Sequence, residues 1–189
     1  MQIIRGDAYN LLCDWVKNEN LRKHMLCVEA VMRAYARKYG EDEEMWGTCG
    51  LLHDFDYERY PTYDAEKQTG HPYEGVKVLK EFDYPEEIIT AILGHAIYSG
   101  VPRETKMAKV LFAVDELCGF VIACALMRPD RLQTLEAPSV KKKLKDKSFA
   151  AKVSRSDIQQ GIVELGIAED GHINFVIQAL RNISKDLGF

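Results

Sequence analysis

The chain has 189 residues and a formal net charge of −4, so it lacks the basic excess that binds nucleic-acid backbones, and we expect no nucleic-acid partner. No apolar run approaches the ~20 residues that span a bilayer, and the first residues lack the apolar core of a secretory signal, so we expect a cytoplasmic protein with no membrane partner. Five cysteines without a C-x-x-C pair argue against a disulfide framework and against a zinc ribbon.

The first third of the chain predicts three consecutive helices and no strand pattern of comparable strength. The first helix is expected to be capped by Asp7. The second covers about 20–39 and places His24 one turn inside its start. The third is expected to deliver His53 and Asp54 at its C-terminal end.

The middle of the chain breaks into an aromatic and charged loop over about 55–70 before the helical pattern returns. We expect this loop to form part of a pocket rim. His71 is then expected at or near the N-cap of the next helix, because Pro72 suits a first-turn position. The helix after that begins at Pro85 and carries His95.

The last part of the chain is also predicted to be helical. A long apolar helix over about 106–127 carries Asp115, an acid that needs a partner, a metal or a solvated cleft. His172 belongs to no apolar segment and is interpreted as a surface or capping residue. Three packing helices are expected over about 138–147, 156–165 and 173–187.

Titratable residues interrupt several of these apolar segments. His53 and Asp54 close the run 49–55, where an unpaired buried charge would cost roughly several kcal/mol. A divalent transition metal would compensate for this charge, since imidazole and carboxylate groups are suitable ligands. The same anomaly recurs in three further apolar segments, at His24, His95 and Asp115.

In chain order these residues resemble the H…HD…D signature of the HD superfamily of metal-dependent hydrolases, over about residues 20–128. With two more histidines the pattern is similar to the H…HD…H…H…D branch that holds two metal ions. That branch includes symmetric diadenosine tetraphosphate hydrolases, HD-GYP cyclic-di-GMP phosphodiesterases and di-iron oxygenases. Tyr57 stands where the HD-GYP enzymes carry a lysine, and the GYP signature is missing, so cyclic-di-GMP is not the favoured substrate.

The resemblance implies an all-α fold, namely an HD-domain helical bundle with C-terminal packing helices. We expect a single domain over residues 1–189, with the motif-bearing core at about 20–128 and accessory helices at about 129–189. The accessory helices are expected to support the core or a homodimer contact.

The resemblance also implies a metal-dependent phosphohydrolase that acts on a phosphate ester or anhydride, in particular of a nucleotide, by attack of a metal-activated water. The ions would be Fe, Mn, Co or Zn. Asp54 would be the catalytic carboxylate that bridges two ions. His71 and His95 would hold one of them, and the remaining ligands the other. The implied metal ligands are His24, His53, Asp54, His71, His95 and Asp115.

Three alternatives stay open at this point. A site with one ion would leave His71 and His95 to support the ligands or to face the substrate. A di-iron oxygenase similar to myo-inositol oxygenase uses the same ligand order to activate O₂. A non-catalytic module would bind a nucleotide or a metal without turnover.

A phosphate substrate also favours fixed cations near the metal ions. Arg103, on the loop after His95, and Lys109, six residues before Asp115, are the candidates for binding the substrate. The alternative for both is a solvated surface side chain. The tyrosines of the aromatic loop and its surroundings fit either nucleobase stacking or simple packing, at positions 57, 60, 63 and 73.

Overall fold

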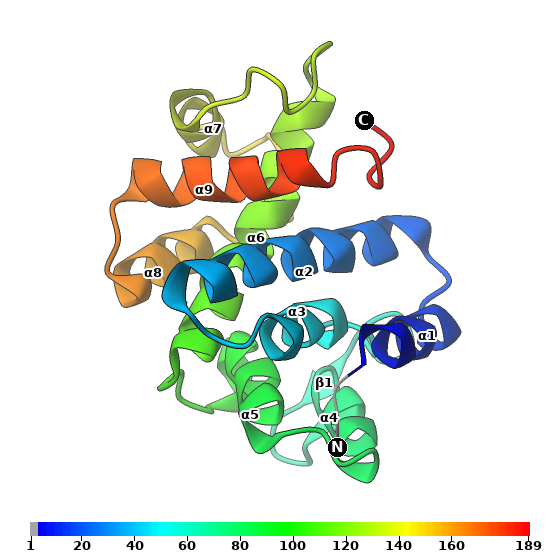
Figure 1. The fold of residues 1–189 in the computed structure, drawn as a ribbon. Coiled ribbons are helices and arrows are strands. Elements are labelled where there is room, and N and C mark those ends of the chain that lie inside the picture. The colour runs from blue at the N-terminus through cyan, green and yellow to red at the C-terminus, as the bar shows by residue number, and fades with distance from the viewer. Residues whose placement is uncertain (1–3) are drawn as a thin grey trace. The chain divides into compact units, whose positions relative to one another are not determined.

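The computed structural model describes residues 4–189, and the described chain is all-α apart from two strands of two residues each, which confirms the predicted fold class (Figure 1). It consists of two compact units, of which one ends at Leu111 and the other begins at Phe112. The elements of the first unit are α1 (Arg5–Trp15), α2 (Glu19–Tyr39), α3 (Glu43–Leu52), β1 (Tyr63–Asp64), β2 (Thr69–Gly70), α4 (Tyr73–Glu81), α5 (Glu86–His95) and the 3-10 helix η1 (Ile97–Ser99). Helix α6 (Lys106–Leu126) begins in the first unit and continues in the second, which also contains α7 (Ala137–Leu144), α8 (Arg155–Leu165) and α9 (Glu169–Asn182).

Local sequence signals set the ends of α2. The Asn18 side chain accepts hydrogen bonds from the backbone N–H groups of Asn20 and Leu21, which satisfies donors that the first helical turn leaves open. The helix ends at Gly40, whose φ of +70° is in the left-handed region that glycine adopts without steric cost. The predicted helix over about 20–39 is therefore confirmed.

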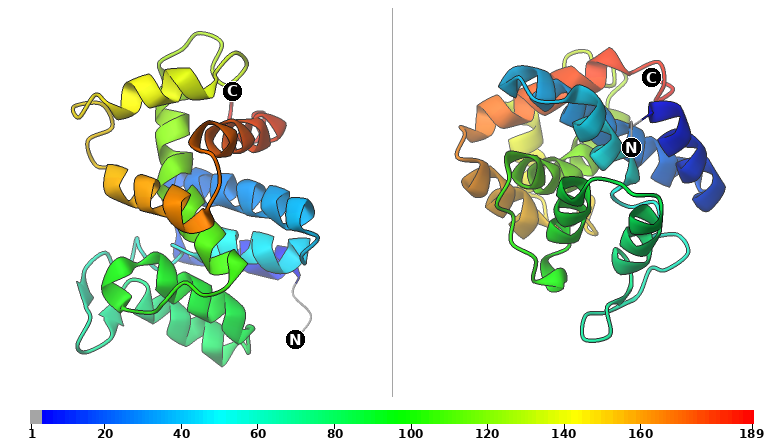
Figure 2. Two further views of the ribbon diagram at one scale, coloured as in Figure 1. Left: turned by 90° about the vertical axis from the view of Figure 1, so that its left-hand side faces the viewer. Right: turned by 60° about the horizontal axis from the view of Figure 1, so that its bottom comes forward.

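Helix α3 packs against α2, and the two lie side by side in every view (Figures 1 and 2). Asp42 caps α3 by accepting a hydrogen bond from the N–H of Met45. Gly50 permits the close approach of the two helices, because a Cβ there would lie 2.9 Å from Cγ of Met32 on α2. The last helical residue is Leu52, so His53 and Asp54 follow at the helix end, as predicted.

The first helix does not begin as expected. Helix α1 starts at Arg5, its N-cap residue is Ile4, and no side chain caps it. The prediction that Asp7 caps this helix is therefore wrong. Asp7 lies inside the first turn, where a carboxylate still interacts favourably with the positive end of the helix dipole.

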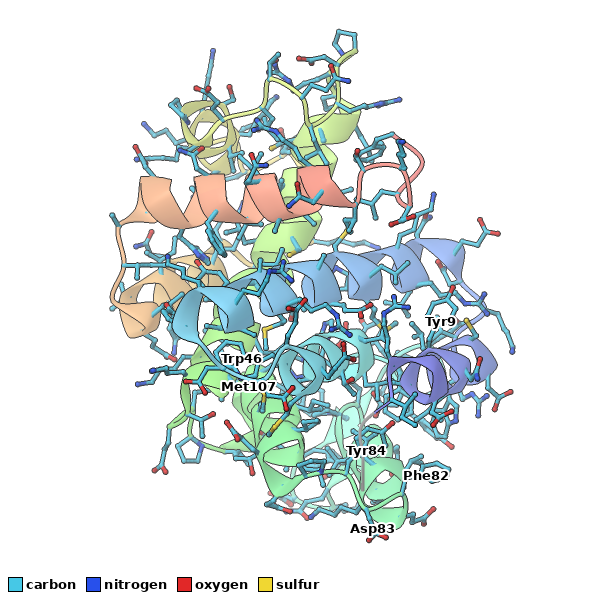
Figure 3. The ribbon with its side chains drawn as sticks, viewed as in Figure 1. Tyr9, Trp46, Phe82, Asp83, Tyr84 and Met107 are labelled. Atoms are coloured by element: carbon cyan, nitrogen blue, oxygen red, sulfur yellow. The ribbon has the colours of Figure 1, made fainter. Side chains whose placement is uncertain are left out.

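The core of the first unit is apolar and includes large aromatic side chains, some of which are labelled in Figure 3. Trp46 of α3 and Met107 of α6 are buried, and Tyr84, just after α4, is buried as well. Phe82 and Asp83 belong to the same turn but are exposed. Asp83 has a φ of +55°, so the chain reverses at this residue and sends Tyr84 back into the core.

In the second unit, α7 packs against α9, and α8 packs against the part of α6 that belongs to this unit. Gly161 of α8 makes the second contact possible, because a Cβ at this position would lie 2.5 Å from Cα of Ala113. The three helices predicted for this part of the chain all exist. The last one begins at Glu169, four residues earlier than expected, because two acidic residues suit its first turn.

His172 also differs from its predicted position. It lies inside α9 with an exposed fraction of 0%, and its Nε2 is 3.0 Å from the carbonyl oxygen of Ala113. The interpretation as a surface or capping residue is therefore wrong. The hydrogen bond to Ala113 offsets the cost of burying the polar ring.

Among the described residues, no helix is both long enough and apolar enough to cross a bilayer. The division into two compact units reflects how densely parts of the chain contact one another, and it does not test the number of domains. The single domain therefore stays a prediction.

Candidate metal centre

The first unit brings together five of the six predicted ligands. His24 projects from the second turn of α2, and His53 and Asp54 follow the last residue of α3. His71 follows β2, and His95 is the last residue of α5. Four separate elements therefore supply these side chains, and three of the four place them at an element end.

These five residues form two groups that share Asp54. Ligand atoms of His24, His53 and Asp54 all lie within 4.8 Å of one another. Ligand atoms of Asp54, His71 and His95 meet the same limit. Imidazole nitrogens and carboxylate oxygens at this spacing are donors that divalent transition metals bind. Each group therefore fits a metal ion by the chemistry of its donors.

The two oxygens of Asp54 face different groups. Oδ2 lies 3.6 Å from Nε2 of His53. Oδ1 lies 3.2 Å from Nε2 of His71 and 3.3 Å from Nε2 of His95. The two nitrogens that face Oδ1 are themselves 3.2 Å apart. A single carboxylate thus lies between two sets of imidazole nitrogens, with one oxygen directed to each set.

His53 and His95 are held in the same way. Each lies at the C-terminal end of a helix, where backbone carbonyl groups have no intrahelical partner. Nδ1 of His53 lies 2.8 Å from the carbonyl oxygen of Gly50, and Nδ1 of His95 is hydrogen bonded to the carbonyl oxygen of Ile92. A carbonyl only accepts, so Nδ1 donates in both rings, and the lone pair is on Nε2. Both Nε2 atoms face Asp54. Each ring is therefore in the tautomer that leaves Nε2 free of a proton, as binding of a metal ion through Nε2 requires.

His71 is held instead by the carboxylate of Asp56, a residue that sequence reasoning did not single out. Nδ1 of His71 donates to Oδ1 of Asp56 at 2.7 Å, and Oδ2 of Asp56 accepts from the N–H of Gly75 at 2.6 Å. Asp56 is 1% exposed, so it is a buried acid with both oxygens in use. The spacing Asp54-Phe55-Asp56 was the only available signal, and it reads equally well as a charged loop.

Burial lowers the pKa of His71, but the hydrogen bond with Asp56 and the negative charge of Asp54 act in the opposite direction and raise its pKa above the ordinary value. Both carboxylates thus favour a positive charge at this position. A cation bound between His71 and Asp54 would have the same favourable surroundings as the proton.

The other predicted site residues are placed as follows. Arg103 donates a hydrogen bond from Nη1 to the carbonyl oxygen of Gly94 at 2.7 Å, and Gly94 is the residue before His95. Lys109 lies in the first turns of α6 and is half-buried. Asp115 lies on α6 beyond the boundary of the first unit and is also half-buried. Their roles stay predictions.

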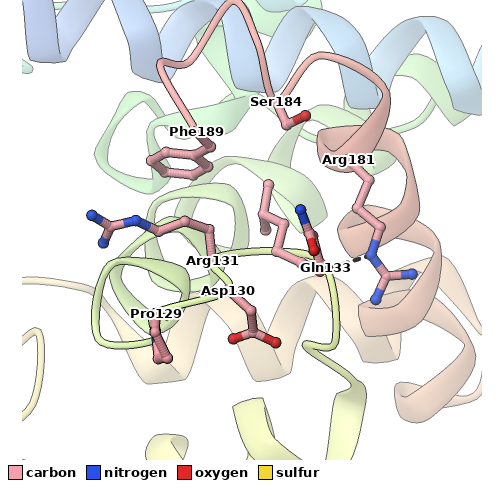
Figure 4. A pocket seen from close by; sticks show the side chains of 8 residues that line it. Pro129, Asp130, Arg131, Gln133, Arg181, Ser184 and Phe189 are labelled. Atoms are coloured by element: carbon pink, nitrogen blue, oxygen red, sulfur yellow. Dashed lines mark hydrogen bonds between the residues drawn. The ribbon is translucent and has the colours of Figure 1, made fainter.

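A cavity of about 370 Å³ lies in the second unit (Figure 4). Its arginines are already bound to backbone groups. Arg181 donates to the carbonyl oxygens of Leu132 and Leu135 at 2.7 and 2.6 Å, and Arg131 donates to that of Leu126 at 2.7 Å. These arginines tie the chain around the cavity, and the cavity is lined by none of the residues in the two ligand groups.

Comparisons with known proteins identify the family of this chain. The model of the HD domain family matches residues 21–119, which are 99 of the 189 residues. Ribonuclease Y from Lawsonia intracellularis (strain PHE/MN1-00) is 32% identical over 101 residues, which are 53% of this chain and 18% of that protein, so the chain spans less than a fifth of this relative's length. No solved structure matches. The chain belongs to the HD domain family, whose members are metal-dependent hydrolases.

Proposed function

We propose that this protein is a phosphohydrolase with two divalent metal ions, which cleaves a phosphate ester or anhydride of a nucleotide. The family and the clustered histidine and aspartate side chains support metal-dependent hydrolysis. The observation that carries the proposal of two ions is the position of Asp54. One of its oxygens faces His53, and the other faces both His71 and His95. A bridging carboxylate has this arrangement in two-metal hydrolytic sites.

The ligands divide into two sets in this proposal. One ion would be held by the imidazoles of His24 and His53, with Asp115 as the further ligand. The other would be held by His71 and His95. Asp54 would be shared by the two ions. The mixed nitrogen and oxygen donors suit Fe, Mn, Co or Zn and not the all-oxygen surroundings that Mg and Ca prefer.

Bound ions of this kind lower the pKa of water toward neutrality and stabilise the charge that develops on phosphoryl oxygens. The protein's own contribution is to fix the ligands before the ions bind. The carbonyl groups of Gly50 and Ile92 orient the rings of His53 and His95, and Asp56 orients His71. Such preorganisation avoids the cost of rearranging the site during the reaction.

Arg103 is the proposed cation for the substrate phosphate. Its aliphatic stem lies close to Gly94 of α5, where an added Cβ would be 3.1 Å from Cγ of Arg103. The hydrogen bond to the carbonyl oxygen of Gly94, the residue before His95, holds the guanidinium in place. A planar guanidinium binds two phosphate oxygens at once. Lys109 is proposed as a second, weaker phosphate contact.

The test is hydrolysis of a panel of substrates, with the products separated and identified by chromatography. The protein would be stripped of metal, loaded separately with Mn²⁺, Co²⁺, Zn²⁺ and Fe²⁺, and incubated with nucleoside mono- and polyphosphates and dinucleoside polyphosphates. We expect metal-dependent hydrolysis that Asp54→Asn abolishes. Asp83→Asn is the matched control, because it makes the same change at an exposed position of the same unit.

Two results would overturn this proposal. One is the absence of any hydrolysis product with every metal and every substrate. The other is oxygen consumption with Fe²⁺ only, which would assign the site to a di-iron oxygenase.

A further inference from the structure

Three tyrosines on the loop between α3 and α4 are unusually exposed. The exposed fractions are 45% for Tyr57, 42% for Tyr60 and 53% for Tyr63. A tyrosine ring is a large apolar surface with one polar atom, and exposed rings of this kind gather at binding sites. Their position relative to the ligand groups therefore needs an explanation.

Tyr63 is stacked on Tyr98. The ring centroids are 3.5 Å apart, and the ring planes differ by 6°. Tyr98 lies in η1, three residues after His95, and its hydroxyl donates a hydrogen bond to the carbonyl oxygen of His71 at 2.9 Å. Tyr98 thus connects the two segments that carry the histidines of the second ligand group.

The hairpin fixes Tyr63 at the same place. Residue Tyr63 of β1 pairs with Gly70 of β2, and Gly70 directly precedes His71. Gly70 has a φ of +81°, and a Cβ there would lie 1.7 Å from the carbonyl oxygen of Thr62. Only glycine permits this close pairing. The position of Tyr63 is therefore tied to that of His71 through the backbone.

The stack leaves one side of Tyr63 open. Tyr98 covers one face of the ring, and 53% of Tyr63 is nevertheless exposed. Tyr57 lies near the same histidine, with its ring centroid 5.3 Å from that of His71 and a ring angle of 81°. The exposed ring of Tyr57 therefore lies beside His71, and the exposed ring of Tyr63 is stacked on Tyr98, whose hydroxyl is bonded to the carbonyl oxygen of His71.

We infer that Tyr63, supported by Tyr98, binds the planar base of a nucleotide whose phosphate is bound by the metal ion that Asp54, His71 and His95 would hold. This inference rests on the proposed function and names the substrate class by its chemistry. Stacking suits any base, since every base has a π face, so the platform selects for an aromatic group and not for one base. Tyr57 contributes a second aromatic surface beside the phosphate.

The other explanation for the stack is that Tyr63 only fastens the hairpin to η1. The two explanations differ in what happens to ligands without a base. Loss of a fastening would weaken all phosphate ligands together, because His71 follows the hairpin directly. Loss of a stacking surface would weaken only ligands that contain a base.

The experiment compares AMP with ribose 5-phosphate by isothermal titration calorimetry on the Mn²⁺-loaded protein, with ligand integrity checked by chromatography afterwards. We expect the parent protein to bind AMP at least tenfold more tightly. Tyr63→Ala should weaken AMP roughly 10- to 100-fold and leave ribose 5-phosphate unchanged. Tyr63→Phe should keep the preference for AMP, because it keeps the ring. Phe82→Ala is the matched control, since Phe82 has the same exposed fraction of 53% but lies at the end of α4 (Figure 3).

Equal affinity of the parent for the two ligands, no binding of either, or a parallel loss of both in Tyr63→Ala would overturn the inference. Its failure differs from failure of the proposed function. Hydrolysis without a preference for AMP would overturn the platform alone. A preference for AMP that Tyr63→Ala removes, without hydrolysis of any substrate, would support the platform and overturn the hydrolase.

Discussion

Buried histidines occur in both compact units, but their rings have different surroundings. In the first unit, Nδ1 of His53 and His95 is bound to a helix carbonyl, while Nε2 of each faces the shared carboxylate of Asp54. In the second unit, Nε2 of His172 is bound to the carbonyl oxygen of Ala113 and serves packing. Burial alone therefore does not identify a functional histidine. What distinguishes the histidines of the first unit is that several titratable groups converge on the same place.

The charged residues of the second unit support the same distinction. Arg155 donates from Nη1 to the carbonyl oxygens of Ala150 and Val153 at 2.6 and 2.8 Å. Arg181 binds carbonyl groups in the same way at the cavity. These guanidinium groups close loops onto helices. Their role is structural, whereas the ionisable groups of the first unit's cluster face one another.

The largest expected difference is between two alanine substitutions, one of a histidine that faces Asp54 and one of a histidine that only packs. His53→Ala should reduce hydrolysis by more than about 100-fold, because even residues that only orient metal ligands contribute 10- to 100-fold. His172→Ala should keep metal content and turnover, and should lower the free energy of unfolding by about 1–3 kcal/mol, since a buried carbonyl loses its partner. Elemental mass spectrometry measures the metal content, chromatography of the hydrolysis products measures turnover, and urea denaturation measures the free energy of unfolding. Loss of metal in His172→Ala would contradict the purely structural role assigned to this histidine.

The second prediction concerns Asp56. Asp56→Asn keeps the size of the side chain but offers one carbonyl oxygen where two carboxylate oxygens now accept from His71 and Gly75. We expect metal affinity to fall about 10- to 100-fold. A competition titration with a chromophoric chelator measures this affinity, with Asp83→Asn as the isosteric control. Equal affinities of the two variants would show that Asp56 does not orient a ligand.

Two glycines, one in each unit, provide a further test of the difference between the units. A Cβ on Gly75 would lie 2.9 Å from Cγ of Asp56, and one on Gly161 would lie 2.5 Å from Cα of Ala113. Both Gly75→Ala and Gly161→Ala should lower the free energy of unfolding by about 1–3 kcal/mol through overpacking. Only Gly75→Ala should also weaken metal binding, because it displaces Asp56. Thermal unfolding with and without Mn²⁺ separates the effects, and equal stabilisation of the variants by metal would contradict this expectation.

The smallest effect concerns a charge in the first unit that lies outside the cluster. Glu44 accepts hydrogen bonds from Arg33, at 2.7 Å for the shorter one, and this interaction lowers the pKa of Glu44 below its usual value of 4.5. A lowered carboxyl pKa stabilises the folded state above pH 4.5, and this contribution is lost as the pH falls through the folded-state pKa. Glu44 is exposed, so its contribution is less than about 1 kcal/mol.

Urea unfolding of the parent and of Glu44→Gln between pH 3 and pH 6 measures this contribution. The two proteins should differ at pH 6 and converge at pH 3, while the metal content at pH 6 is the same. A constant difference over this range would show that the carboxylate charge is not responsible.

Much of the fold and of the candidate site could be predicted because the signals are local. The capping residue Asn18 and the left-handed Gly40 define α2, and apolar spacing places His24 on that helix. The end of α3 at Leu52 puts His53 and Asp54 where the sequence pattern placed them. Local rules of capping and spacing are sufficient for features of this kind.

The rest depends on contacts between distant residues. Asp56 looks like a loop charge until α4 brings the N–H of Gly75 to it, 19 residues further along the chain. His172 stands among polar neighbours, and its burial depends on Ala113, which is 59 residues away. The stack of Tyr63 on Tyr98 likewise requires the hairpin and η1 to meet. Periodicity carries no information about such pairs.

The central claim is that Asp54 is shared by two metal ions, and metal stoichiometry tests it most directly. The parent protein, His71→Ala and His95→Ala would be purified without added metal, and their metal content per chain measured by elemental mass spectrometry. We predict about two equivalents in the parent and about one in each variant. One equivalent in all three proteins would contradict the shared carboxylate and leave a site with a single ion.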